Sequence, residues 1–304
     1  MSNIESTSND KRDVYQKVTD AIINAIEQGA GTYRMPWVVR QDKGFSPVSV
    51  STAKPYHGVN TLVLWSQSQT KSYSSALWGT YKQWQSLGAQ VRKGEHGSPV
   101  VYWGSYETES KECRDDETDA TRTRLFCKGH TVFNLEQVDN VQLPKRFDVT
   151  LSANERIARA ESFFTSVGVP VRDGGNRAYY RSDTDAVYMP EFGQFPEASR
   201  YYSVLAHETT HWTSHASRCN RELGKRFGDD VYAMEELVAE LGSAYTMAAL
   251  QLELTPRTDH AAYIDSWVKV LKSDKRAIFT AASQAQRATN WLTERSGCPA
   301  EVAA

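Results

Sequence analysis

The sequence lacks several features that would assign it to a class at once. Its 304 residues include only four cysteines, which lie far apart at positions 113, 127, 219 and 298 and form no C-x-x-C pair. Neither a disulfide framework nor a four-thiolate zinc site is therefore expected, and the thiols should be reduced. No run of eighteen apolar residues and no basic-then-apolar leader occurs. We therefore expect a cytoplasmic protein with no membrane association.

A strong overall charge is also absent, because the formal net charge is only −2. The charge is nevertheless unevenly distributed. Between residues 31 and 100, eight Lys and Arg stand against two acidic residues, so this stretch has a net charge of +6 (eight minus two). The segment 107–119 that follows carries seven acidic residues and reads as a solvated loop. Local asymmetry of this kind steers polyanions, even when the whole chain is nearly neutral.

The periodicity of apolar residues predicts an α+β protein with two parts. An amphipathic helix is expected from Val14 to Ile26, followed as far as residue 141 by short aromatic and β-branched runs with one helix at 81–87. From residue 150 onward, helical spacing predominates and a strand hairpin is expected at 177–189. We therefore predict a mixed α+β N-terminal domain at 12–143 and a mainly helical domain with a small sheet at 150–296.

The most informative motif is His207-Glu-Thr-Thr-His211. Two histidines four residues apart lie on one face of a helix, so both imidazoles can bind a single ion. Zinc lowers the pKa of a bound water to about 7, and Glu208 is placed to take its proton as a general base. The alternative is an exposed helix that carries two histidines by chance.

A catalytic zinc site needs a third protein ligand from another element. On a helix that begins near Asp230, Glu236 and Glu240 share one face, so Glu236 is the predicted ligand and Glu240 the predicted partner of the free His207 ring nitrogen. Glu235 is the alternative ligand, because a one-residue error in register would exchange the roles. The ligand set suits Zn²⁺ first, although Mn²⁺ or another divalent ion would fit the same groups. His260 and Tyr263 could stabilise an oxyanion or make structural hydrogen bonds.

Aromatic and basic residues alternate within the positive stretch. Stacking rings and cations that follow the backbone are what single-stranded nucleic acid requires, although a β-rich core also needs aromatic residues. The candidate DNA-binding residues are Arg34, Trp37, Lys82, Trp84, Arg92 and Lys93.

Longer sequence blocks carry a resemblance to a known family. The N-terminal half contains Asp13-Val-Tyr15, Pro36-Trp37, Thr80-Tyr-Lys-Gln-Trp84, Gly88-Ala-Gln-Val-Arg-Lys-Gly94 and Thr131-Val-Phe-Asn134, and the C-terminal half contains Leu205-Ala-His-Glu-Thr-Thr-His-Trp-Thr213, Leu223-Gly-Lys-Arg-Phe-Gly228, Glu235-Glu-Leu-Val-Ala-Glu-Leu-Gly242 and Asp274-Lys-Arg-Ala-Ile-Phe279. With these blocks the chain resembles the ArdC-type antirestriction proteins of conjugative plasmids, whose N-terminal domain is shared with TraC-type plasmid primases. One departure is Thr209-Thr210, which lacks the small Gly common before the second histidine.

The resemblance implies a function in plasmid transfer. A protein of this family is expected to bind incoming DNA while it is single-stranded and to protect it from host restriction endonucleases. Its C-terminal half is expected to be a zincin-like metallopeptidase domain with His207, His211 and one acid of the Glu235-Glu236 pair on the metal and Glu208 catalytic. Two functions remain open: a DNA-coating protein whose metal is structural, or a metalloprotease that cleaves a host protein or peptide, such as a restriction component or a regulator.

Overall fold

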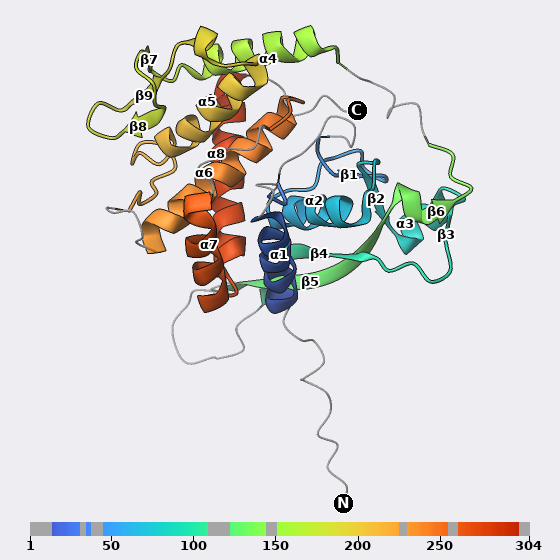
Figure 1. Ribbon diagram of the computed structural model, residues 1–304. Coiled ribbons are helices and arrows are strands. Elements are labelled where there is room, and N and C mark those ends of the chain that lie inside the picture. The colour runs from blue at the N-terminus through green and yellow to red at the C-terminus, as the bar shows by residue number, and fades with distance from the viewer. Residues whose placement is uncertain are drawn as a thin grey trace, which may run out of the picture.

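The computed structural model describes residues 14–30, 35–37, 45–108, 122–143, 151–224, 230–254 and 261–297 (Figure 1). The first half contains both helices and strands. Its elements are α1 (Val14–Ala30), β1 (Val48–Ser49), α2 (Val59–Lys71), β2 (Leu77–Thr80), α3 (Tyr81–Ser86), β3 (Gln90–Val91), β4 (Ser98–Thr108), β5 (Arg122–Asn134), a 3-10 turn at Leu135–Gln137, and β6 (Val138–Asp139).

Helices dominate the second half, which also holds a small sheet. Its elements are α4 (Ala153–Val167), β7 (Val171–Asp173), β8 (Tyr179–Arg181), β9 (Ala186–Met189), a 3-10 turn at Phe192–Gln194, α5 (Ala198–Trp212), α6 (Asp230–Ala249), α7 (Ala261–Ser273) and α8 (Ala277–Ser296). The predicted α+β class is confirmed. The helix predicted from Val14 to Ile26 corresponds to α1, and the hairpin predicted at 177–189 corresponds to β8 and β9.

Three sheets organise the strands of the described residues. The largest has the order β1-β2-β5-β4, and its long antiparallel hairpin pairs β4 with β5 from Ser98↔Val132 to Thr108↔Arg122. A two-stranded sheet joins β3 to β6, and the third sheet has the order β7-β9-β8. In Figure 1 the β4–β5 hairpin runs below α2 and crosses behind the lower part of α1, whereas α3, β3 and β6 form a small lobe at the far end from α5 and α6.

One apolar core joins the two halves. Buried residues of α1 and α2 belong to the same cluster as those of α4 to α8. The Trp37 ring lies 5.8 Å from the Trp267 ring on α7, and the Tyr245 hydroxyl on α6 donates a 2.9 Å hydrogen bond to the Gly58 carbonyl. The predicted boundary near residues 144–149 lies outside the described residues, so the division into 12–143 and 150–296 stays a prediction.

The α3–β3–β6 lobe has a small core of its own. Thr80 caps α3 through a capping box with Gln83, so the helix begins immediately after β2. Trp84 of α3 is fully buried against the cluster that includes Val50 and Val138, and its indole N–H donates to the Phe133 carbonyl at 3.0 Å.

Among the described helices, none is both long enough and apolar enough to span a membrane.

Candidate metal centre

Helix α5 carries the His-Glu-Thr-Thr-His motif on a buried segment. It begins after the N-cap residue Glu197 and ends at Trp212, with Thr213 as the C-cap, and the residues from Leu205 to Trp212 are buried. Because four residues make slightly more than one helical turn, His207 and His211 point the same way, and their ring centroids lie 4.9 Å apart. The periodicity of the sequence is therefore enough to place both imidazoles on one side.

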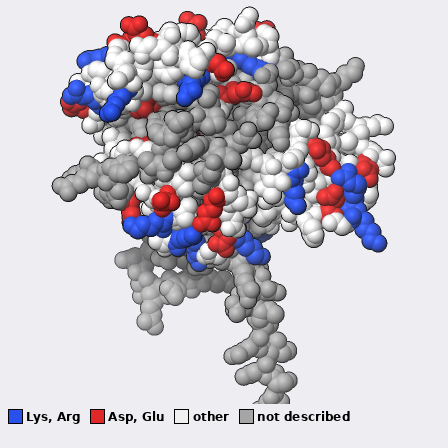
Figure 2. Space-filling view, viewed as in Figure 1, with Lys and Arg blue, Asp and Glu red and all other residues white. Residues whose placement is uncertain are grey.

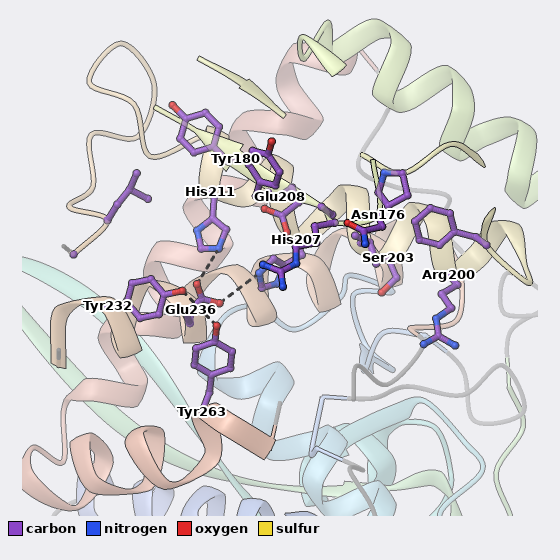
Figure 3. A pocket seen from close by; sticks show the side chains of 18 residues that line it. Asn176, Tyr180, Arg200, Ser203, His207, Glu208, His211, Tyr232, Glu236 and Tyr263 are labelled. Carbon is purple, nitrogen blue, oxygen red and sulfur yellow. Dashed lines mark hydrogen bonds and ion pairs between the residues drawn. The ribbon is translucent and has the colours of Figure 1, made fainter. Parts of the chain in front are cut away.

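Helix α6 supplies the facing carboxylate. Glu236 Oε2 lies 3.6 Å from His207 Nε2, and Glu236 Oε1 lies 3.6 Å from His211 Nε2. Figure 3 shows the three side chains converging from the two helices. One atom of each of these three residues lies within 4.8 Å of the other two, which makes the group a candidate metal site. The structure thus brings together the ligand set predicted from the sequence, and binding of an ion by it stays a prediction.

Two further carboxylates face the opposite nitrogens of the histidine rings. Glu240 Oε1 lies 3.0 Å from His207 Nδ1, and Glu235 Oε1 lies 3.2 Å from His211 Nδ1. A carboxylate at Nδ1 favours the tautomer that leaves the Nε2 lone pair free for an ion. Glu235 therefore lies on the Nδ1 side of the His211 ring, and Glu236 lies on its Nε2 side, toward the candidate metal site.

Close approach of the two helices makes this arrangement possible. A Cβ atom added to Gly242 on α6 would lie 2.5 Å from Thr210 Cγ2 and 2.7 Å from Thr210 Oγ1. The pair Thr209-Thr210 lacks the small residue that is common before the second histidine of this motif. Here the facing helix supplies the missing space through Gly242, so Thr210 fits without pushing α5 away from Glu236.

The electrostatics of the centre favour an ionised Glu236. Burial by itself raises the pKa of the Glu236 carboxyl, but interactions with His207, His211 and Tyr232 lower it to about 2. Burial also raises the pKa of the Tyr232 phenol, and its hydrogen bond with Tyr263 and the nearby Glu236 raise it further. The two phenol oxygens lie 3.3 Å apart. Tyr232 is therefore a neutral hydrogen-bond donor beside the carboxylate.

The centre lies in a cleft of about 750 Å³. Its walls come from the segment before β8, from α5, from α6 and α7, and from the chain after α5. Glu208 lines this cleft beside the two histidines, and Figure 3 shows it on the same side as Tyr180. Tyr263 also lines it, whereas His260 lies outside the described residues. The predicted general base thus lines a cleft of a size typical of ligand sites, and its catalytic role stays a prediction.

The donor set fits a divalent ion. A tetrahedral ion with ligand bonds of about 2.0–2.2 Å separates its ligand atoms by about 3.3–3.6 Å. The two Nε2-to-carboxylate distances of 3.6 Å agree with this spacing and are too long for direct hydrogen bonds. Two neutral imidazoles and one carboxylate are the ligands of a catalytic zinc site that keeps a fourth position open.

Comparison with known proteins agrees with this architecture. The model for the N-terminal domain of anti-restriction factor ArdC matches residues 12–133, and a zincin-like metallopeptidase model matches residues 158–284. Crystal structures of the antirestriction ArdC protein from the R388 plasmid are 38% identical and superpose with a TM-score of 0.76. The alignment covers 94% of this chain and 98% of the metal-free ArdC chain, or 99% of the Mn(II)-bound one.

This chain belongs to the ArdC family. It is 47% identical to the uncharacterized protein y4eC of Sinorhizobium fredii (strain NBRC 101917 / NGR234) over 92% of this chain and 91% of that protein. It is also 36% identical to two DNA primases TraC of Escherichia coli over 93% of this chain. The match spans only 27% and 20% of the length of those primases, so their whole activity does not transfer to this chain.

Burial of two tryptophans in the N-terminal half corrects two of the DNA-binding predictions. Trp37 and Trp84 each have 0% of their surface exposed, and both rings pack within apolar clusters. A ring with no exposed face cannot stack on a base, so the prediction that these two residues contact DNA directly is wrong for this conformation. A sequence does not reveal which aromatic residues fill a core. Arg34 lies outside the described residues.

The predicted cations of the lobe lie on its surface. Lys82, Arg92 and Lys93 are exposed, on α3 and next to β3. Arg92 forms ion pairs with Glu95 at 2.8 Å and with Asp139 at 3.4 Å, so part of its charge is neutralised within the lobe. Figure 2 shows basic and acidic side chains adjacent there. Contact of these residues with DNA stays a prediction.

Two sets of residues were not among the predicted site residues. Tyr102 and Trp103 of β4 are 57% and 47% exposed, which makes them more accessible aromatic residues than the two tryptophans chosen. Arg221, which binds Glu235 behind the metal centre, had no sequence signal of its own. It follows the motif by ten residues in an irregular segment, so only the fold brings it back to α6.

Proposed function

We propose that this protein binds the single-stranded DNA of an incoming conjugative plasmid and protects it from host restriction endonucleases. The observation that carries the proposal is the match over nearly the whole chain to the antirestriction ArdC protein of plasmid R388. Sequence identity of 38% through both halves is stronger support for a shared function than similarity of the fold alone would be.

The N-terminal half would supply the affinity for DNA. Its sequence between residues 31 and 100 has a net charge of +6, and Lys82 and Lys93 project from the surface of the lobe. Exposed cations release counterions when they contact phosphates, which gives affinity for any sequence. Relatives that are DNA primases support a role of this region in DNA binding.

The C-terminal half would hold a divalent ion between His207, His211 and Glu236. We assign Zn²⁺ from the donor set, with Mn²⁺ as the alternative because one R388 structure contains Mn(II). The ion would support the fold directly by joining α5 to α6, since the ligands come from both helices.

A second function, peptide-bond hydrolysis, is favoured by the position of Glu208. A divalent ion in the site would polarise a carbonyl and lower the pKa of water to about 7. Glu208 lines the cleft where it could accept that proton, and Tyr232 and Tyr263 line the cleft near Glu236, where a phenol could donate to a developing oxyanion. The substrate would be a host protein, such as a restriction component or a regulator, and DNA binding would serve for targeting.

The deciding experiment measures protection of a transferred plasmid in a recipient that carries a restriction system. Wild type is compared with Glu208→Gln at matched protein levels and confirmed metal content. Glu208→Gln keeps the size of the side chain and both histidines but removes the base. The control is Glu222→Gln, the same chemical change at an exposed position that does not line the cleft.

Each outcome selects one function. If Glu208→Gln loses protection while Glu222→Gln retains it, the protein works as a hydrolase. If both variants protect fully, protection comes from DNA binding and the ion is structural. If wild type gives no protection at all, the antirestriction proposal itself is overturned.

A further inference from the structure

Behind His211 lies a buried network that the proposed function does not use. The Arg221 guanidinium donates to both oxygens of Glu235, from Nε to Oε2 at 3.0 Å and from an Nη to Oε1 at 2.8 Å. Only 5% of the Arg221 side chain and 4% of the Glu235 side chain are exposed. The same Glu235 Oε1 lies 3.2 Å from His211 Nδ1. The chain of contacts therefore runs from an arginine to a carboxylate to a predicted metal ligand.

Arg221 also holds the backbone next to that ligand. The guanidinium makes two further contacts: it donates to the Thr210 carbonyl at 2.7 Å and to Thr213 Oγ1 at 2.9 Å. Thr210 immediately precedes His211 near the end of α5. One guanidinium thus fixes His211 twice, through the partner of its ring and through its neighbouring peptide.

We infer that Arg221 is a positioning residue for the metal centre, acting through Glu235 on the imidazole of His211. A bidentate arginine fixes the plane of a carboxylate and compensates its charge away from water. The oriented Glu235 accepts the Nδ1–H of His211, and this tautomer directs the Nε2 lone pair toward Glu236. The inference rests on the proposed metal site, because positioning matters only if His211 binds an ion.

A purely structural role is the alternative, and the chain contains a matched control for it. Arg218 lies in the same segment and is also buried, with 7% of its side chain exposed. It donates to the Trp212 carbonyl at 2.7 Å, lies 4.0 Å over the Trp212 ring and pairs with Asp185. Arg218 therefore fastens the same segment to the same helix end without a described contact to His211 or Glu235.

The test measures metal affinity in the full-length protein. Mn(II) and Zn(II) alone serve as the probes, in competition with a chromogenic chelator, for wild type, Arg221→Met, Glu235→Gln, the double variant and Arg218→Met. Thermal unfolding without metal reports the structural effect separately. The Mn(II) electron paramagnetic resonance spectrum reports the geometry of the site.

We expect Arg221→Met and Glu235→Gln each to weaken metal binding by roughly 10–100-fold and to change the Mn(II) spectrum. The double variant should bind no more weakly than Glu235→Gln alone, because Arg221 acts through that carboxylate. Removing both partners also avoids a lone buried charge, so the double variant stays testable if a single variant does not fold. Arg218→Met should lower the unfolding temperature and leave metal affinity unchanged.

Two results would overturn the role of Arg221. One is a folded Arg221→Met variant, or for an unfolded one a double variant, whose metal affinity is within twofold of wild type, and the other is an equal loss of affinity in Arg218→Met. Failure of wild type to bind either metal would instead overturn the metal site of the proposed function.

Discussion

The metal centre and the α3–β3–β6 lobe use charged residues in opposite ways. At the centre, the charged and polar side chains of α5 and α6 are buried, and each predicted ligand meets partners on a facing helix. In the lobe, Lys82, Arg92 and Lys93 lie on the surface, where Arg92 pairs with Glu95 and Asp139, and the largest buried side chain is that of Trp84.

The two regions should differ in how large an effect a single substitution has. Away from water, charge interactions are weakly screened and each group needs a fixed partner, so one substitution disturbs the whole site. On the surface, solvent and salt screen each charge, so affinity for DNA comes from many small contributions. Within the lobe, substitutions of core residues should therefore change the stability of the protein, whereas substitutions of the surface cations should change only DNA binding.

The largest effect is expected from Trp84→Ala. Removing a fully buried indole should lower the free energy of unfolding by about 3–5 kcal/mol, because it leaves a cavity in the small core of the lobe. Denaturant unfolding measures this, with Trp103→Ala as the control because 47% of Trp103 is exposed. If Trp84→Ala unfolded like wild type but lost affinity for single-stranded DNA, the burial of this ring would not describe the DNA-binding state.

Glu236→Gln should remove most of the metal affinity. Loss of a ligand is expected to cost more than the roughly 10–100-fold that loss of an outer partner costs. Titration with Mn(II) measures the change, and Glu235→Gln is the matched comparison on the same helix. A weaker effect for Glu236→Gln than for Glu235→Gln would exchange the roles of the two carboxylates.

Gly242→Ala should separate the two helices of the centre. The added Cβ would overlap Thr210, which should lower the free energy of unfolding by about 1–3 kcal/mol. Metal affinity should fall as well, since Glu236 would move away from His207 and His211. Thermal unfolding with and without metal tests both effects. Thr210→Ala in the same protein should restore much of each loss, and no restoration would show that this contact does not set the helix spacing.

The smallest effect is expected from the surface cations of the lobe. Changing Lys82 and Lys93 together to Ala should reduce the salt dependence of single-stranded DNA binding by about 1.4 in log–log slope, at roughly 0.7 for each lost phosphate contact. Arg92→Ala should change it less, because its charge is already paired with Glu95 and Asp139. Fluorescence anisotropy at several salt concentrations measures the slopes. An unchanged slope in the double lysine variant would move the DNA surface elsewhere, with exposed Tyr102 and Trp103 the next residues to test.

Local periodicity determined a large part of this protein. Spacing of four residues places His207 beside His211, and the same spacing places Glu236 and Glu240 on one face of α6, because every α-helix has the same rise and turn. Runs of β-branched and aromatic residues likewise predicted strands and a mixed α+β class. These features depend only on neighbours in the chain, so the sequence alone was enough.

Tertiary packing decided the rest. It placed Glu236, and not Glu235, between the Nε2 atoms of the two histidines, and it brought Arg221 into contact with α6. It also set Gly242 against Thr210 and buried Trp37 and Trp84 in separate apolar clusters. Each outcome depends on which surfaces of distant segments meet. A residue type states which contacts are possible, but only the approach of two elements determines which of them form and which groups lose access to water.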